Sequence, residues 1–202
     1  MKIFTLFFLS CLWLGGTILS CSANQNTFAL KIPAIVDQHI VTLYTCDGEN
    51  TSPAIFWSGE PKETKSYVLI VHDPDAPHDP SSLDGSFVHW AIYNIPAKLN
   101  HLPKGISRDK TLPNGTMQGR NSFHRFGYDG PCPPANETHH YTFTFYALNT
   151  MLSVKHGAAV DDLQNAMQGH VIATTQLMGI YASPHHTERA TTLDRPNMQL
   201  ED

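Results

Sequence analysis

Apolar residues in this chain gather mainly in runs of strand length. Residues 66–72 and 87–95 are continuous apolar runs rich in β-branched and aromatic residues, which is typical of strands buried on both faces. Residues 141–148 alternate instead, with aromatic side chains on one face and threonines on the other. Shorter strand candidates lie at 40–44 and 55–57, and turn-rich segments separate the runs. The pattern predicts a mostly β protein.

A different period begins near the C-terminal end. Apolar residues recur at helical spacing from Leu163 to Leu177, an aspartate can cap the start, and Gly179 can end the helix. We therefore expect a C-terminal helix at about 161–178. The residues that follow, 183–202, are polar and predict a surface tail.

The N-terminus has the layout of a secretory signal. Lys2 precedes an apolar run at 3–14 that is too short to span a bilayer. Residues 18–21 resemble a bacterial lipobox, which would place a lipid on Cys21 and tether the protein to a membrane. Cleavage after Ala23 would instead release a free protein. We expect an exported protein, either a periplasmic or membrane-anchored lipoprotein or a secreted one.

The chain divides simply on these grounds. The signal peptide covers 1–20, a short tether 21–27, one domain 28–182 and the polar tail 183–202. No internal repeat or linker splits the 202-residue chain, which is long enough to bury a core.

The composition and the histidine spacing argue against nucleic acid as a partner and against a bound metal ion. The chain has 13 Lys and Arg against 18 Asp and Glu, a net charge of −5, and no basic stripe, which argues against nucleic acid. Its 12 histidines include adjacent pairs at 139–140 and 185–186. Neighbouring strand residues point to opposite faces, so the first pair does not suit one metal ion. We expect no metal and no cofactor, and membrane contact only through a lipid on Cys21.

Four cysteines leave one candidate pair in the mature chain. Cys11 belongs to the signal and Cys21 is lipidated or removed, so Cys46 and Cys132 remain. In an oxidising compartment these two could form a disulfide. Two buried free thiols are the alternative.

Polar residues interrupt the apolar strands at three places. Asp73 directly follows the first buried run, and His89 lies inside the second. A proline-rich segment at 130–134 precedes the third, where His139 and Tyr141 share the face of the aromatic residues. This face therefore opens into a polar pocket at its start. Each signal is weak alone, since a lone buried histidine is usually a hydrogen-bonded structural residue.

Together these segments resemble the phosphatidylethanolamine-binding protein family, also called the Raf-kinase-inhibitor-like family. The resemblance spans about 28–181, with the motifs in family order. The motifs that carry it are DPDAP at 73–77, VHW at 88–90, GPCPP at 130–134 and HHY at 139–141. Further matches to the bacterial branch are TCDGENTSP at 45–53 with Trp57, NIPA at 94–97 and QGRN at 118–121.

The resemblance implies a β-sandwich-like fold, in which a large antiparallel sheet packs on a smaller one with peripheral helices. It also implies a small anion pocket whose ligand-binding residues are Asp73, His89, Gly130, Pro131, His139 and Tyr141. Pro133, Pro134 and Trp90 would shape the rim. The chain departs from the family at His140, where an arginine is common.

The residue types suit anion binding. An imidazole beside a carboxylate tends to keep its proton, so His89 or His139 can donate a charge-assisted hydrogen bond to a phosphate-type oxygen. Asp73 would orient a histidine or pair with an amine of a phospholipid headgroup. The leading hypothesis is a binding protein for such ligands that modulates a kinase or another partner protein.

Two other classes stay open. A hydrolase or transferase could use the His/Asp group as a base, but no nucleophile motif accompanies it. An inhibitor of a protease or kinase could act through surface loops. We expect binding rather than catalysis.

Overall fold

A computed structural model describes residues 27–79 and 85–184 of the chain. The predicted signal peptide, the lipidation candidate Cys21, almost all of the tether and the tail from residue 185 lie outside the described residues. Within the described part, no helix combines the length and the hydropathy that crossing a membrane requires.

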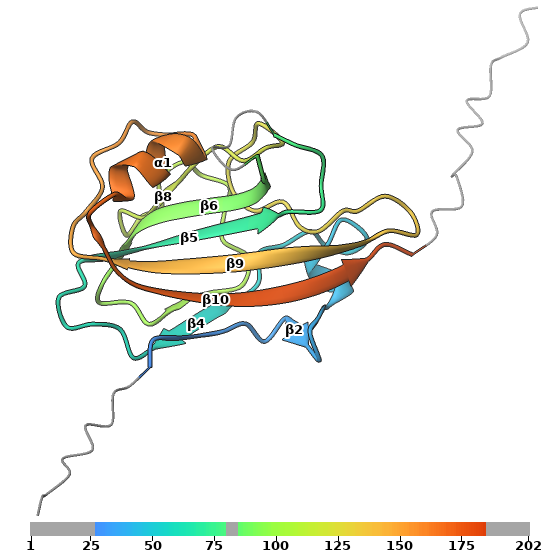
Figure 1. Cartoon of the computed structure of the whole chain (residues 1–202), viewed down its shortest axis with the longest axis horizontal. Helices are drawn as coiled ribbons and strands as arrows, with labels where there is room; N and C mark the ends of the chain where they lie inside the picture. Colours follow the sequence, from blue (N-terminus) through green and yellow to red (C-terminus); the bar gives the residue numbers. More distant parts are fainter. Residues whose placement is uncertain (1–26, 80–84, 185–202) are drawn as a thin grey trace, which may run out of the picture.

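Seven strands form the large sheet, in the order β2-β3-β10-β9-β5-β6-β8 (Figure 1). Their bounds are β2 (Ile35–Val36), β3 (His39–Ile40), β5 (Ser66–Asp73), β6 (Phe87–Pro96), β8 (Met117–Gln118), β9 (Thr138–Leu148) and β10 (Val171–Ala182). β5 lies between β6 and β9 and is antiparallel to both. The two continuous apolar runs are therefore neighbouring central strands, buried on both faces as their composition predicts.

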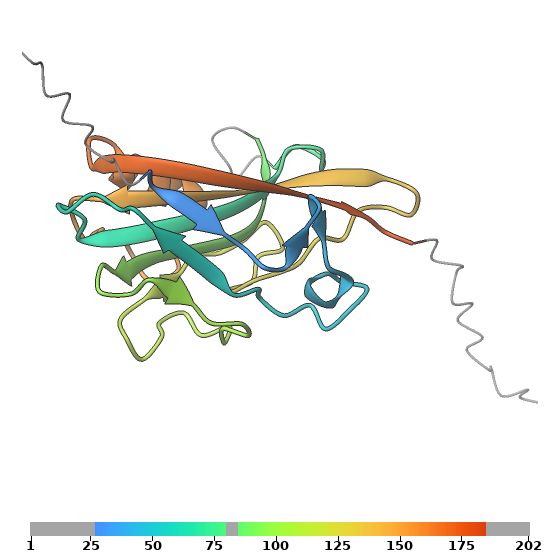
Figure 2. The same cartoon turned by 90° about the horizontal axis from the view of Figure 1, so that it is seen from below.

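A second sheet of three strands, β1 (Ala29–Lys31), β4 (Ile55–Ser58) and β7 (His101–Leu102), packs on one face of the first (Figure 2). Trp57 of β4 places its ring 4.6 Å from that of Phe145 on β9 and 5.1 Å from that of Tyr67 on β5. Burial of such large aromatic surfaces is a dominant contribution to core stability. The predicted sandwich of a large and a small sheet is confirmed.

The opposite face of the large sheet is covered in part by α1 (Val160–Met167). Leu163 and Met167 of the helix pack into a second apolar cluster with Val68 and Ile70 of β5. No side chain caps the helix start at Ala159, but two aspartates in the first turn suit the positive end of its dipole.

The predicted helix at 161–178 is correct only from 161 to 167. Helix α1 ends at Met167, and Gly169 then adopts a left-handed φ of +74° with open space around its Cα. From Val171 the chain forms β10, which pairs with β9 along its whole length. Residues 171–175 are rich in β-branched side chains, and this strand pairing outweighs the weak helical spacing.

Two smaller predictions also change. Gly179 does not end a helix but lies within β10, where a Cβ atom would come within 2.6 Å of Ile40. The candidate strand at 40–44 is replaced by the short β3 and by a 3₁₀ turn, η1 (Thr42–Tyr44). That turn begins the loop that carries Cys46.

Candidate functional site

Antiparallel pairing brings three of the predicted polar positions to one end of the large sheet. Asp73 is the last residue of β5 and pairs with Phe87 at the start of β6. On the other side of β5, His72 pairs with Thr142 in the first half of β9, so the end of β5 lies beside the part of β9 that holds His139. Residues more than 60 positions apart therefore meet because a strand's end lies beside the starts of its antiparallel neighbours.

A β-bulge aims His89 at this place. Val71 pairs with Trp90 whereas the next residue, His72, pairs with Val88, so β6 has one extra residue there. Val88 and Trp90 consequently lie in different apolar clusters, although simple alternation would put them on one face. The ring of His89 meets that of Tyr141 edge to face at 5.1 Å.

The carboxylate of Asp73 is shared between the backbone and the histidines. Its Oδ1 accepts the amide hydrogens of Asp75 and Ala76 at 2.9 and 3.1 Å, a turn that the Asp-Pro sequence favours. Its Oδ2 lies 2.8 Å from Nδ1 of His139 and 3.8 Å from Nε2 of His89. The backbone contacts thus hold the second oxygen between the two rings.

Burial and hydrogen bonding shift the pKa values of Asp73 and His139 in opposite directions. Burial raises the pKa of Asp73, but hydrogen bonds from His89, His139 and the Asp75 amide outweigh it and leave the pKa below its usual value. Burial lowers the pKa of His139, but hydrogen bonds to Asp73 and Glu137 outweigh it and leave that pKa raised. The pair therefore favours a carboxylate beside an imidazolium.

Tyr141 contributes a buried hydroxyl group whose polar neighbours include the Asp73 carboxylate and the backbone of Cys132. Its side chain is fully buried, and among the described residues none accepts from or donates to the hydroxyl with regular hydrogen-bond geometry. Burial and the nearby charge of Asp73 raise the pKa of Tyr141, so the hydroxyl keeps its proton. A buried donor without a regular hydrogen bond is uncommon, and a ligand oxygen is one group that could accept from it.

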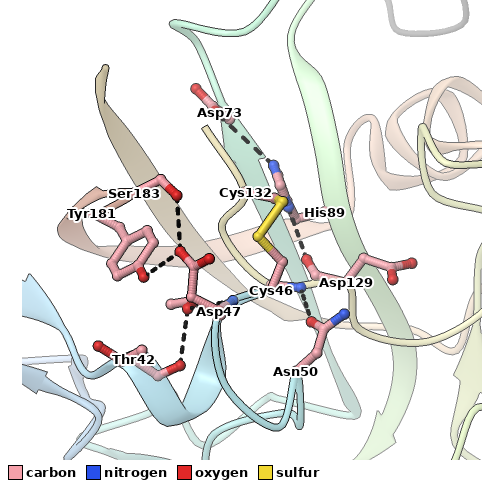
Figure 3. The surroundings of a disulfide bond; sticks show 12 residues. Thr42, Cys46, Asp47, Asn50, Asp73, His89, Asp129, Cys132, Tyr181 and Ser183 are labelled. Carbon is pink, nitrogen blue, oxygen red and sulfur yellow. Dashed lines mark hydrogen bonds and ion pairs between the residues drawn. A yellow bond between two sulfur atoms is a disulfide. The ribbon is translucent and has the colours of Figure 1, made fainter. Parts of the chain in front are cut away.

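The segment 129–134 is tied to the loop that follows η1. Cys46 and Cys132 form a disulfide, so the predicted pair is confirmed and the alternative of two free thiols is wrong (Figure 3). The Cys46 amide also donates to the carbonyl of Pro131 at 3.0 Å. The Gly130 amide donates to Oδ1 of Asn50 at 2.7 Å. These bonds fix the backbone of Gly130 and Pro131, the two residues of this segment that were predicted to bind the ligand.

Gly130 is required by the closeness of the two segments. A Cβ atom at this position would lie 2.2 Å from the carbonyl oxygen of Tyr44 and 3.0 Å from Cα of Thr45. Both are backbone atoms, so neither can move aside cheaply. A larger residue would force segment 129–134 and the loop that follows η1 apart.

The predicted rim residues are placed differently from one another. Pro133 is buried and Pro134 is exposed, where its carbonyl accepts the Glu137 amide at 3.0 Å. Trp90 does not form a rim, because it is fully buried in the core and its indole donates to Gln118 at 2.8 Å. Its large apolar ring suits the core, where its one polar atom still finds an acceptor.

The sequence interpretation missed Asp129, which lies under His89. Its backbone carbonyl oxygen is 2.8 Å from Nδ1 of His89, so this nitrogen carries the hydrogen and Nε2 faces Asp73 (Figure 3). Its buried carboxylate is held by Arg108 at 3.0 Å and Arg125 at 2.7 Å. Position 129 directly precedes the GPCPP motif, which was the one available signal.

His140, the departure from the family pattern, points away from the cluster as strand alternation predicts. Its Nδ1 lies 2.7 Å from Oδ2 of Asp75, and both side chains are about two-fifths exposed, at 43% and 40%. A hydrogen bond from His140 is the main reason why the pKa of Asp75 is lowered. Among the described residues, no group of three or more His, Cys, Asp or Glu side chains suits a metal ion.

Comparison with known proteins identifies the family. The phosphatidylethanolamine-binding protein family matches residues 31–182, three-quarters of the chain. The chain belongs to the phosphatidylethanolamine-binding protein family. A UPF0098 protein of Methanothermobacter thermautotrophicus is 43% identical over 153 residues, which cover 75% of this chain and 97% of that protein.

Solved structures of family members support the same placement. A putative family homologue from Chlamydia trachomatis has a TM-score of 0.68 and 39% identity, covering 78% of this chain and 99% of that one. YbcL of Escherichia coli, described as a member of the mammalian family, has a TM-score of 0.68 and 35% identity, covering 77% and 98%. The resemblance inferred from the motifs is thereby confirmed.

Proposed function

We propose that this family member binds small phosphate-type anions, free or as phospholipid headgroups, at the cluster of Asp73, His89, His139 and Tyr141. The observation that carries the proposal is the contact of His139 with the Asp73 carboxylate, which helps to raise the pKa of the imidazole, beside the buried hydroxyl of Tyr141, which makes no regular hydrogen bond. A phosphate oxygen would accept from both groups, and hydrogen bonds from an ionised donor are about twice as strong as neutral ones.

Binding suits these residues better than catalysis. A nucleophile needs a base that removes its proton. The raised pKa of Tyr141 keeps its hydroxyl protonated, and the sulfur of Cys132 is bonded to Cys46. Asp73 has both oxygens engaged by the protein, which fits an orienting role. We therefore propose a binding protein and not an enzyme.

Inorganic phosphate titrated by calorimetry at pH 6 and pH 8 tests the proposal. We expect weak binding at pH 6 that falls at pH 8, because deprotonation of His139 removes the charged donor. His139→Gln should remove the pH dependence, whereas His101→Gln, which changes an exposed histidine of the other sheet, should keep it. The absence of binding of phosphate and of phosphoethanolamine at both pH values would refute the proposal.

We also propose that the protein is exported. The disulfide supports this, because such bonds persist mainly in oxidising compartments. The intact mass of the mature protein, measured with and without reductant, tests the proposal. A mass that includes the whole N-terminal apolar segment would contradict it, and a diacylglycerol adduct would show lipidation of Cys21.

A further inference from the structure

The imidazole of His139 faces one carboxylate on each side. Its Nδ1 lies 2.8 Å from Asp73, and its Nε2 lies 3.3 Å from Oε2 of Glu137. The first contact is buried, since the Asp73 side chain is only 3% exposed, whereas the side chain of Glu137 is 59% exposed. Nε2 is therefore the nitrogen whose carboxylate partner is exposed to solvent.

Local chain geometry places Glu137 there. It stands two residues before His139 and directly before β9, and its contact with the ring matches the spacing at which residues of an extended chain project to the same face. A turn closed by the Glu137 amide and the carbonyl of Pro134, with a φ of +69° at Asn136, leads the chain into β9. The contact follows from the direction of the strand and does not depend on a distant segment.

The carboxylates of Asp73 and Glu137 differ in how easily a ligand could displace them from His139. Asp73 is held by two backbone amides and by burial. Glu137 has the longer contact to His139, and exposed ion pairs are weak. The other acid nearby, Asp75, is already paired with His140 at 2.7 Å. Glu137 is thus the group that an incoming anion would replace.

We propose that Glu137 is a specificity-determining residue that acts as an internal competitor for Nε2 of His139. An anionic ligand must displace its carboxylate, whose charge then remains beside the bound anion. A ligand that carries an ammonium group next to its phosphate compensates for that charge, and a bare phosphate does not. This inference rests on the proposed function and concerns the selectivity of the same site.

Calorimetric titrations of phosphate and phosphoethanolamine at pH 6 test the inference. We expect the unmodified protein to bind phosphoethanolamine more tightly. Glu137→Gln, which keeps the size of the side chain and removes its charge, should raise phosphate affinity by about threefold to tenfold. It should raise phosphoethanolamine affinity less, so the ratio of the two affinities falls towards one. Glu63→Gln, at an exposed position, should change neither affinity.

The outcomes separate this inference from the proposed function. If the unmodified protein binds phosphate and Glu137→Gln leaves that affinity unchanged or lower, the inference is wrong and the proposed function stands. An equal gain for both ligands refutes the role in selectivity. If neither ligand binds to the unmodified protein, the proposed function fails. The ¹⁵N shift of Nε2 in His139 should also move in Glu137→Gln, because this nitrogen loses its carboxylate neighbour, and an unchanged shift would contradict the contact on which the inference rests.

Discussion

The central strands β5, β6 and β9 bury apolar side chains at one end of the sheet and polar side chains at the other. Under α1, the start of β5 and the end of β9 contribute apolar side chains, including Val68 and Leu148. At the opposite end the same strands bury Asp73, His89 and His139, none of which is more than 5% exposed. A single sheet therefore carries a packed end and a polar end about one strand length apart.

The two ends are held by different kinds of interaction. Apolar packing is nondirectional, so the packed end tolerates changes that conserve volume. The polar end requires directional partners, and these are supplied by the Asp73 turn, the Asp129 carbonyl and the loop tied by the disulfide. Changes at the packed end should alter stability alone, whereas changes at the polar end should alter binding and its pH response.

The largest effect should come from removing the disulfide. The Cys46–Cys132 bond closes a loop with a sequence separation of 86 residues. Replacing both cysteines by serine should lower the free energy of unfolding by about 4–5 kcal/mol in the chain-entropy description. Because segment 129–134 also loosens, phosphate affinity should fall. Urea unfolding with and without reductant measures the first effect, and equal unfolding midpoints would contradict it.

Leu163→Ala should lower the stability of the packed end and leave phosphate binding at the polar end unchanged. The side chain is completely buried between α1 and the sheet, and its truncation leaves a cavity that costs about 3 kcal/mol. Phosphate affinity at pH 6 should stay within about twofold, a change of less than ~0.5 kcal/mol. A large loss of affinity in the folded variant would show that the two ends are coupled.

His139 should give the polar end a pH response. Burial lowers its pKa, but hydrogen bonds to Asp73 and Glu137 outweigh this and raise it above the ordinary 6.5. A raised pKa stabilises the folded state fully below about pH 6.5, and this contribution is lost as the pH rises through the folded-state pKa. Chemical unfolding between pH 6 and 9 should therefore show falling stability. His139→Gln should flatten the profile, and an unchanged slope would contradict the assignment.

His140→Arg should have the smallest effect. The His140 side chain lies on the outer face of the sheet, where its contact with Asp75 is partly exposed. Such pairs contribute about 0–1 kcal/mol, and an arginine can keep the contact. Stability and phosphate affinity should both change little. A clear gain in phosphate affinity on titration would place residue 140 at the site after all.

The fold was predictable where the pattern is a local property of the chain. The apolar runs at 66–72 and 87–95 and the alternation from Tyr141 to Leu148 indicate strands whatever their neighbours are. The convergence of Asp73, His89 and His139 was expected only through the family resemblance. Glu137 carries no such signal and Asp129 only its position before the GPCPP motif, because a sequence does not show which acidic side chains are buried or which histidine they meet.

The sequence by itself thus determined which segments are buried strands and which cysteines are available to pair, since burial and periodicity are written along the chain. Only the tertiary structure decided that residues 171–178 continue as β10, because hydrogen bonding to β9 outweighs their helical spacing. It also decided the direction of His89, because the bulge that turns it towards Asp73 depends on register with β5. Register is a relation between strands, and no single strand specifies it.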